Sequence, residues 1–182
     1  RLIVGGILVK KAILEELPIR DTILKLDNDI PFNRMPDNHT LEKEIDLIEM
    51  CRKIILNTLN ELIIKYGQDL KNEQWVLEPY ADMVISFSVM NIGFIRYNQM
   101  DESNKKNHML SVLRCSLYRH LELIISKGKY INNYIYDEMT SNDINEKLDS
   151  DIKSLNWYVD TISLEKNIYK TLSKYNGKYY LD

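Results

Sequence analysis

The sequence predicts an all-α protein, an antiparallel helical bundle followed by a tyrosine-rich helical appendage. Three observations support this prediction. Only 6 glycines and 4 prolines interrupt the 182 residues. Apolar residues recur at steps of three and four along several long segments, as they do on one face of a helix. The segments between them are short and polar, which favours antiparallel neighbours. A chain of this length can bury a core in one domain, with or without an appendage.

Residues 1–38 are predicted to hold a helix, a short helical stretch and a loop. Apolar side chains recur at helical spacing over residues 1–17, until Pro18, which cannot continue a helix. The pair Gly5-Gly6 lacks the third glycine and the preceding strand of a phosphate-binding loop. We therefore expect it to allow close packing against a neighbour. A short helical stretch over 21–26 and a proline-marked loop over 27–38 follow.

The bundle is predicted over residues 39–128 and contains three long helices. The clearest covers 40–66, where Gly67 marks the end and an apolar stripe alternates steps of four and three: Leu41, Ile45, Ile48, Ile55, Leu59, Leu62 and Tyr66. A second helix covers about 72–97, with Asn72 as its N-cap and either a kink at Pro79 or a start just before it. A third covers 109–126, with Gly128 beyond its end.

Residues 129–182 form the predicted appendage, which carries most of the 12 tyrosines. Two short helices are expected, at about 143–158 and 163–175, with Gly177 after the second. Tyrosines can form a platform for stacking nucleotides, or they can make contacts at an interface. Because the chain is acidic, the interface is the better interpretation.

Charge and cysteine content narrow the classes of function. The net charge is −3, and the lysines are spread among acidic residues, which argues against a nucleic-acid surface. Cys51 and Cys115 each lie in an apolar helical pattern, so we expect two buried thiols in a reducing compartment, although one disulfide is conceivable. No secretory signal and no apolar run long enough to span a bilayer are visible.

No catalytic, cofactor-binding or metal-binding residue can be assigned from the pattern. His39, His108 and His120 are too far apart to share a metal ion. No Ser or Cys has the strand–turn–helix setting of a nucleophile elbow. Asp82 is the one acidic residue in the apolar part of the second bundle helix that follows Pro79. It could be a functional buried carboxylate, but a structural ion pair with Arg52 or Arg114 is the better interpretation.

Two stretches resemble the acyl-CoA dehydrogenase family. The sequence Arg-Leu-Ile-Val-Gly-Gly-Ile-Leu-Val-Lys-Lys-Ala-Ile-Leu-Glu-Glu-Leu-Pro, residues 1–18, resembles the helix that closes the dehydrogenase fold. The sequence Lys-Asn-Glu-Gln-Trp-Val-Leu-Glu-Pro-Tyr-Ala-Asp-Met-Val-Ile, residues 71–85, is similar to a pattern in the C-terminal helical domain of the very-long-chain type and its bacterial relatives. The resemblance covers about residues 1–127 in order. Pro79 departs from it, since the family usually has a helix former there.

This resemblance implies that residues 1–38 are the closing helix and a linker, and that the chain is cut from a longer flavoprotein. The parent would be an FAD-dependent oxidoreductase of fatty acid β-oxidation that dehydrogenates a fatty acyl-CoA at its α,β bond. In that reaction a glutamate removes the α-proton and a hydride passes to the flavin. The family's Glu-Gly-Thr motif, with that glutamate, would lie before Arg1, so this fragment carries no catalytic residue and no cofactor of its own.

The implied role of the fragment is structural, a dimer contact or association with a membrane. Its partners would be the upstream catalytic domain of the same protein and, in a homodimer, a second copy. Membrane contact is poorly supported, because the second bundle helix offers mainly Arg96 beside its apolar face. The resemblance places the parent in the cytoplasm of a bacterium or the mitochondrion of a eukaryote. The alternative is a free-standing helical protein-interaction module, indicated by the regular stripe over 40–66 and the tyrosine-rich tail.

Overall fold

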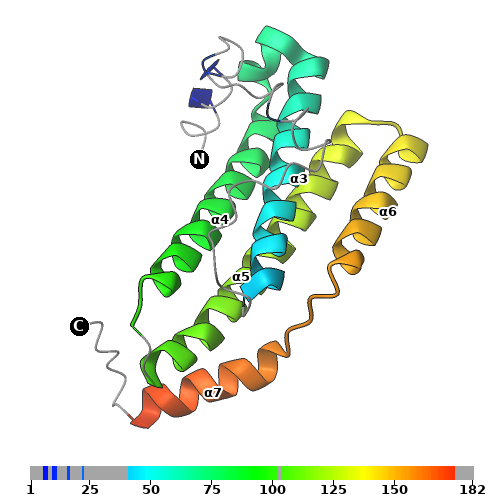
Figure 1. Cartoon of the computed structure of the whole chain (residues 1–182). Coiled ribbons are helices and arrows are strands. Elements are labelled where there is room, and N and C mark those ends of the chain that lie inside the picture. The colour runs from blue at the N-terminus through cyan, green and yellow to red at the C-terminus, as the bar shows by residue number, and fades with distance from the viewer. Residues whose placement is uncertain are drawn as a thin grey trace.

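The computed structural model describes residues 41–101 and 104–174, with Gly6, Ile7, Lys10, Lys11, Glu16 and Thr22 before them. Within these residues the secondary structure is entirely helical, which confirms the predicted all-α class. The long helices α3 (Glu42–Tyr66), α4 (Gln74–Asn98) and α5 (Asn104–Ile135) lie side by side and alternate in direction. Helices α6 (Glu138–Ser154) and α7 (Thr161–Lys174) pack on α5, along its second and first halves respectively (Figure 1).

The core lies where α3, α4 and α5 meet, because each helix turns one apolar face inward. The stripe predicted over 40–66 is confirmed. Leu41, Ile48, Ile55, Leu59 and Leu62 are buried, and the remaining two members, Ile45 and Tyr66, pack against the same cluster. From α4 and α5 the core receives a larger set of buried side chains: Val76, Leu77, Tyr80, Met83, Met90, Phe94, Tyr97, Leu113, Leu117, Leu121, Ile124, Ile131 and Ile135.

The expected end of the third bundle helix at Ser126 is wrong, since α5 continues through Gly128 to Ile135. Gly128 does not stop the helix, because it lies at the centre of the bundle. A Cβ atom there would sit 3.6 Å from the Met83 side chain and 3.8 Å from that of Ile54. The true end of α5 is fastened to α3. The Tyr136 hydroxyl donates a 2.5 Å hydrogen bond to the Glu61 carboxylate, and Lys65 donates to the carbonyl of Ile135.

The start of α4 also differs from the prediction. Residues Gly67–Asn72 form a 3₁₀ turn, so Asn72 ends that turn and does not cap the next helix. Gly67 has φ of +51°, a conformation that favours glycine. Helix α4 begins at Gln74 and runs through Pro79. Pro79 lies near the helix start, where its missing N–H removes a single hydrogen bond, to the carbonyl of Trp75.

The two appended helices are present, with boundaries that differ from the predicted 143–158 and 163–175. Helix α6 begins five residues earlier because the Asp137 carboxylate accepts hydrogen bonds from the backbone N–H and hydroxyl of Thr140, at 3.0 and 2.8 Å. Asp160 does the same for Ser163 ahead of α7, at 3.0 and 2.7 Å. The division into a bundle over 39–128 and an appendage over 129–182 stays a prediction.

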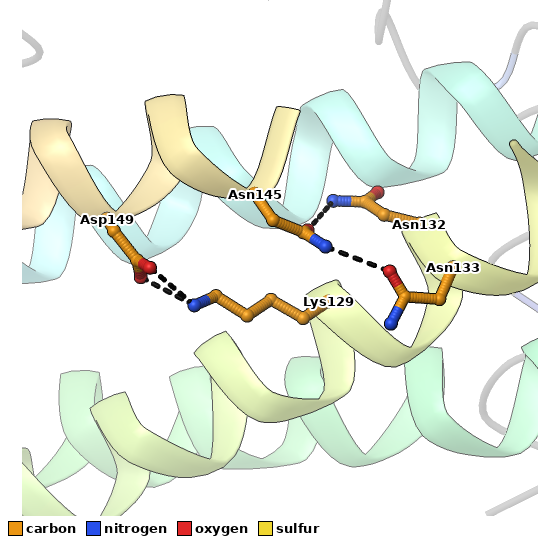
Figure 2. Close-up of polar contacts among 5 residues, drawn as sticks. All are labelled: Lys129, Asn132, Asn133, Asn145 and Asp149. Atoms are coloured by element: carbon orange, nitrogen blue, oxygen red, sulfur yellow. Dashed lines mark hydrogen bonds and ion pairs between the residues drawn. The ribbon is translucent and has the colours of Figure 1, made fainter. Parts of the chain in front are cut away.

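Helix α6 is held to α5 by several polar side chains, beside Leu148, which packs against the core cluster. The Lys129 ammonium pairs with the Asp149 carboxylate at 2.6 Å. Asn145 accepts a 3.0 Å hydrogen bond from Asn132 and donates one of 2.9 Å to Asn133 (Figure 2). Within α6 itself only Ser141 is buried. This helix is therefore attached in part by contacts that water and salt can replace.

The structure bears little on the predictions for residues 1–38. The helices expected over 1–17 and 21–26, the loop over 27–38 and His39 lie outside the described residues, apart from the few named above. In the described part of the chain, nothing lies within 4 Å of a Cβ atom placed at Gly6, and the close packing predicted for the pair Gly5-Gly6 stays a prediction. Among the described residues, no helix is long and apolar enough to cross a membrane.

Candidate functional site

The two described histidines, His108 and His120, are not arranged to share a metal ion. His108 and His120 both lie on α5, twelve residues apart, which separates them by about 18 Å along the helix. Burial lowers the pKa of both side chains. No group of three His, Cys, Asp or Glu side chains in the described part of the chain is arranged to hold a metal ion.

Asp82 takes part in a structural ion pair. Its carboxylate lies 3.7 Å from the Lys127 ammonium of α5, and its side chain is largely buried. The two arginines proposed as partners pair with glutamates. Arg52 contacts Glu49 at 2.6 Å, and Arg114 contacts Glu44 at 2.7 Å. The structure thus gives Asp82 a lysine partner that the sequence did not single out.

Glu44 is a buried charge that the sequence did not reveal. Its position in the first turn of α3 indicated only a favourable interaction with the helix dipole. In the structure the residue is 2% exposed, and its carboxylate accepts a hydrogen bond from the Arg114 guanidinium. The partner is 70 residues away in the chain, so no local pattern could have predicted the pair.

Both cysteines are free and buried, as predicted. Burial raises the pKa of the Cys51 thiol to about 12. Burial also raises the pKa of Cys115, with a further rise from Glu165 and an opposing effect of Arg119. A thiol is nucleophilic only as the thiolate, so these environments suppress covalent chemistry at both positions.

The described aromatic residues of the tail differ in their surroundings. Tyr118 of α5 stacks on Trp157, with ring centroids 6.4 Å apart, and so helps to hold the connector between α6 and α7. Tyr158 and Tyr169 are largely exposed and lie on the connector and on α7. An interface role for the exposed pair stays a prediction.

The most distinctive surface of the described structure is the outer side of α4. From Met83 to Ile95 this helix contains no charged residue. Its inner side supplies the core, yet Ile85, Val89 and Ile92 are 40%, 41% and 65% exposed. They follow one another at steps of four and three, so they share one side of the helix. We call Ile85, Val89, Ile92 and the adjacent Arg96 the α4 face.

A shallow groove of about 270 Å³ lies between the α4 face and α5. Its walls are mainly apolar, with one guanidinium at the edge, and are formed by Val89, Ile92, Gly93, Arg96, Tyr97, Met109, Val112, Leu113 and Ser116. Gly93 keeps the groove open, because it places no side chain over Leu113, whose nearest atom lies 3.6 Å from the missing Cβ position. Lys106 lies over the Tyr97 ring, 5.5 Å from its centroid.

The residues of this surface are of the kind that bind another molecule. The groove offers apolar contact and a single cation, and none of the buried polar side-chain atoms in the described structure lacks a hydrogen-bond partner. An uncharged apolar strip on an exposed helix is typical of a surface that another protein surface covers. The sequence missed this strip because α4 is apolar on nearly all sides, so its outward residues could not be separated from its core residues.

Comparisons with known proteins point to one family. The chain is 30% identical over 98 residues to a probable acyl-CoA dehydrogenase of Bacillus subtilis, a match that covers 53% of this chain and 16% of that protein. Its fold is similar to that of an acyl-CoA dehydrogenase from Bacillus anthracis solved with FAD, with a TM-score of 0.78 and 20% identity. That match covers 98% of this chain and 31% of the solved one. No family model matches the chain.

These comparisons confirm the resemblance to the helical C-terminal region of acyl-CoA dehydrogenases that residues 1–18 and 71–85 indicated. The chain corresponds to less than a third of either relative's length. The very-long-chain type stays a prediction.

Proposed function

We propose that this chain, which is similar to a helical region of the acyl-CoA dehydrogenases, is a non-catalytic domain that supplies a contact surface to a larger flavoprotein. The α4 face is the observation that carries the proposal, because its exposed apolar residues Ile85, Val89 and Ile92 are costly to leave in water. In this role the fragment stabilises or assembles the parent and takes no part in the chemical step.

The parent, in this proposal, binds FAD and removes hydrogen from the α,β bond of a fatty acyl-CoA. Two facts support it: the name of the B. subtilis relative, and the FAD complex of the B. anthracis protein whose fold contains this one. The described residues support the division of labour. Their histidines are far apart, and burial raises the pKa of both thiols. We place the catalytic base and the flavin site in the upstream part of the parent, in the bacterial cytoplasm or the mitochondrion.

The contact role is tested with two neighbouring substitutions in the full-length parent. Ile92→Glu places a charge on the α4 face. Asn91→Glu places the same charge on the preceding residue, which is also exposed. We expect Ile92→Glu to lower the parent's thermal midpoint or disrupt its assembly, and Asn91→Glu to have little effect. Equal effects of the two variants would show that the α4 face is ordinary solvated surface.

The non-catalytic role is tested by absorbance. We expect the purified 182-residue chain to be colourless, and the full-length parent to show the visible absorbance of bound flavin. A stoichiometric yellow cofactor on the isolated chain would overturn the proposed division of labour. A parent gene without a flavoprotein domain upstream would favour the free-standing interaction module instead.

A further inference from the structure

Helix α7 packs on α5 without entering the core (Figure 1). None of its residues, all of which are described, is buried. Leu164, Ile168 and Leu172 follow one another at steps of four and form an apolar side that is only half-buried. The side chains that pack against the core cluster include Leu155 and Trp157 of the preceding connector and no residue of α7. The connector therefore belongs to the core, whereas α7 lies outside it.

The connector is fastened at two points just before α7 begins. Trp157 stacks on Tyr118 of α5, and Lys43 of α3 donates a 3.1 Å hydrogen bond to the carbonyl of Asn156. The next three residues, 158–160, lie outside any helix, and Tyr158 is largely exposed. A few residues between two elements are enough to act as a hinge. Residues 158–160 can thus let α7 move while the connector stays in place.

An ion pair at the surface joins α7 to α5. Arg119 and Glu165 are 2.6 Å apart, and their side chains are 69% and 49% exposed. An exposed pair of this kind contributes little to stability and is weakened further by salt. This polar contact therefore does not prevent α7 from leaving α5.

Cys115 lies on the side of α5 that α7 covers. It precedes Arg119 by four residues, so the two share one side of the helix. Its side chain is only 7% exposed. Burial raises the pKa of the thiol, Glu165 of α7 raises it further, and Arg119 lowers it. Cys51, in contrast, belongs to the core cluster of the three long helices. The two thiols thus lie beneath different parts of the fold.

We propose that α7 is a hinged cover, which moves away from α5 as a unit about residues 158–160 while α3, α4 and α5 stay packed. The inference goes beyond the proposed function, because it concerns α7 and does not involve the α4 face. Elements with few buried contacts are the first to open in a folded protein. Opening exposes the apolar side of α7 and the side of α5 that holds Cys115, so the fold has two states with different surfaces.

Alkylation of the two thiols by N-ethylmaleimide, an uncharged reagent, measures this opening on the full 182-residue chain. Peptide mass spectrometry assigns each adduct. We expect Cys115 to react at least about tenfold faster than Cys51, because Cys51 becomes accessible only when the three long helices separate. Equal rates would show that one global unfolding exposes both thiols, and would overturn the hinged cover.

Two substitutions distinguish opening from direct attack on the closed protein. Arg119→Gln and Glu165→Gln each remove the ion pair, so both should speed alkylation of Cys115, by about two- to fivefold. In the closed protein they would act in opposite directions, because Arg119 lowers the pKa of this thiol and Glu165 raises it, and the thiolate is the reactive form. Slower alkylation in Arg119→Gln would therefore overturn the proposal. Lys129→Gln, which removes the comparable pair between α5 and α6, is the matched control and should leave the Cys115 rate unchanged.

Hydrogen exchange of the α7 amides supplies a second measurement. A helix that leaves as a unit should exchange its central amides together, before those of α3 and the middle of α5. Arg119→Gln, Glu165→Gln and added salt should each speed this exchange. Exchange of α7 that is as slow as that of α3, or that neither substitution changes, would contradict the hinged cover.

Discussion

Glu44 and Arg114 join the first turn of α3 to the middle of α5, across 2.7 Å. The carboxylate is almost fully buried, while the guanidinium remains partly exposed to solvent. Removal of the arginine would leave a buried charge without its partner, which is among the more damaging changes a single substitution can cause.

We therefore expect Arg114→Ala to lower the free energy of unfolding by about 2 kcal/mol, below the value for a fully buried pair because Arg114 is partly solvated. Arg119→Ala is the matched control. Arg119 lies on the same helix and pairs with Glu165 at 2.6 Å, but both side chains are exposed, so we expect a loss of under about 1 kcal/mol. Urea unfolding measures both. Equal losses would show that burial of Glu44 contributes nothing.

A second residue-scale prediction concerns alkaline pH. Burial raises the pKa of Cys51 from 9.0 to about 12, and burial also raises the pKa of Tyr80. Above pH 9 the unfolded chain loses the thiol proton while the folded chain keeps it. Stability is thus fully present below pH 9 and falls as the pH rises toward 12, by at most about 1.4 kcal/mol per pH unit from this thiol.

Urea unfolding at a series of pH values between 8 and 11 tests this expectation. Cys51→Ala should be less stable than the unmodified chain at neutral pH, because it leaves a small cavity. Its stability should also fall less steeply above pH 9, since the remaining slope comes from tyrosines such as Tyr80. Parallel slopes in the two proteins would exclude Cys51 as a source of alkaline instability.

At the scale of the helices, the periodicity of the sequence predicted the features that depend on local patterns. It failed for features that depend on contacts between residues far apart in the chain. The apolar stripe of α3 could be predicted because only one face of that helix is apolar. Gly128 was misread as a helix end because its role depends on Met83 and Ile54, which come from two other helices. Asp137 and Asp160 were missed, although an aspartate three residues before Thr140 or Ser163 is a recognisable helix-capping signal.

Gly128 gives an element-scale prediction. In the middle of α5 a glycine costs up to about 1 kcal/mol relative to alanine. The Cβ of an alanine would make ordinary contacts at 3.6 and 3.8 Å. We expect Gly128→Ala to raise the thermal midpoint, and Gly128→Leu to lower stability by about 1–3 kcal/mol through overpacking. Destabilisation by alanine would show that the helices approach each other more closely than the structure indicates.

At the scale of the whole molecule, α5 is the helix on which the others pack. Helices α3 and α4 bury many apolar side chains against it, whereas α6 adds the polar contacts of Lys129, Asn132 and Asn133 to the packing of a partly buried Leu148. Stability is therefore unequal across the fold. We expect amide hydrogens of α6 to exchange with solvent before those of α3 and α5, measured by mass spectrometry.

Added salt and a substitution of Lys129 test the expected hydrogen exchange of α6 further. Added salt screens the partly exposed pair of Lys129 and Asp149, so it should speed exchange in α6 and leave the buried middle of α5 unchanged. Lys129→Met should have the same effect at low salt. If α6 exchanged as slowly as α5 under all these conditions, its attachment would be tighter than its polar contacts suggest.

The length of α5 has a consequence for how the protein is made. A ribosome releases α3 and α4 first, and the apolar side chains that they bury against α5 stay uncovered until α5 has emerged. Ile131 and Ile135 are buried in the last turns of α5. Lys65 donates a hydrogen bond to the Ile135 carbonyl, and the adjacent Tyr136 donates one to Glu61. A nascent chain that stops at residue 128 would still lack them. We therefore expect folding to be complete only once Tyr136 has left the exit tunnel, and a chain truncated before that point to be less stable.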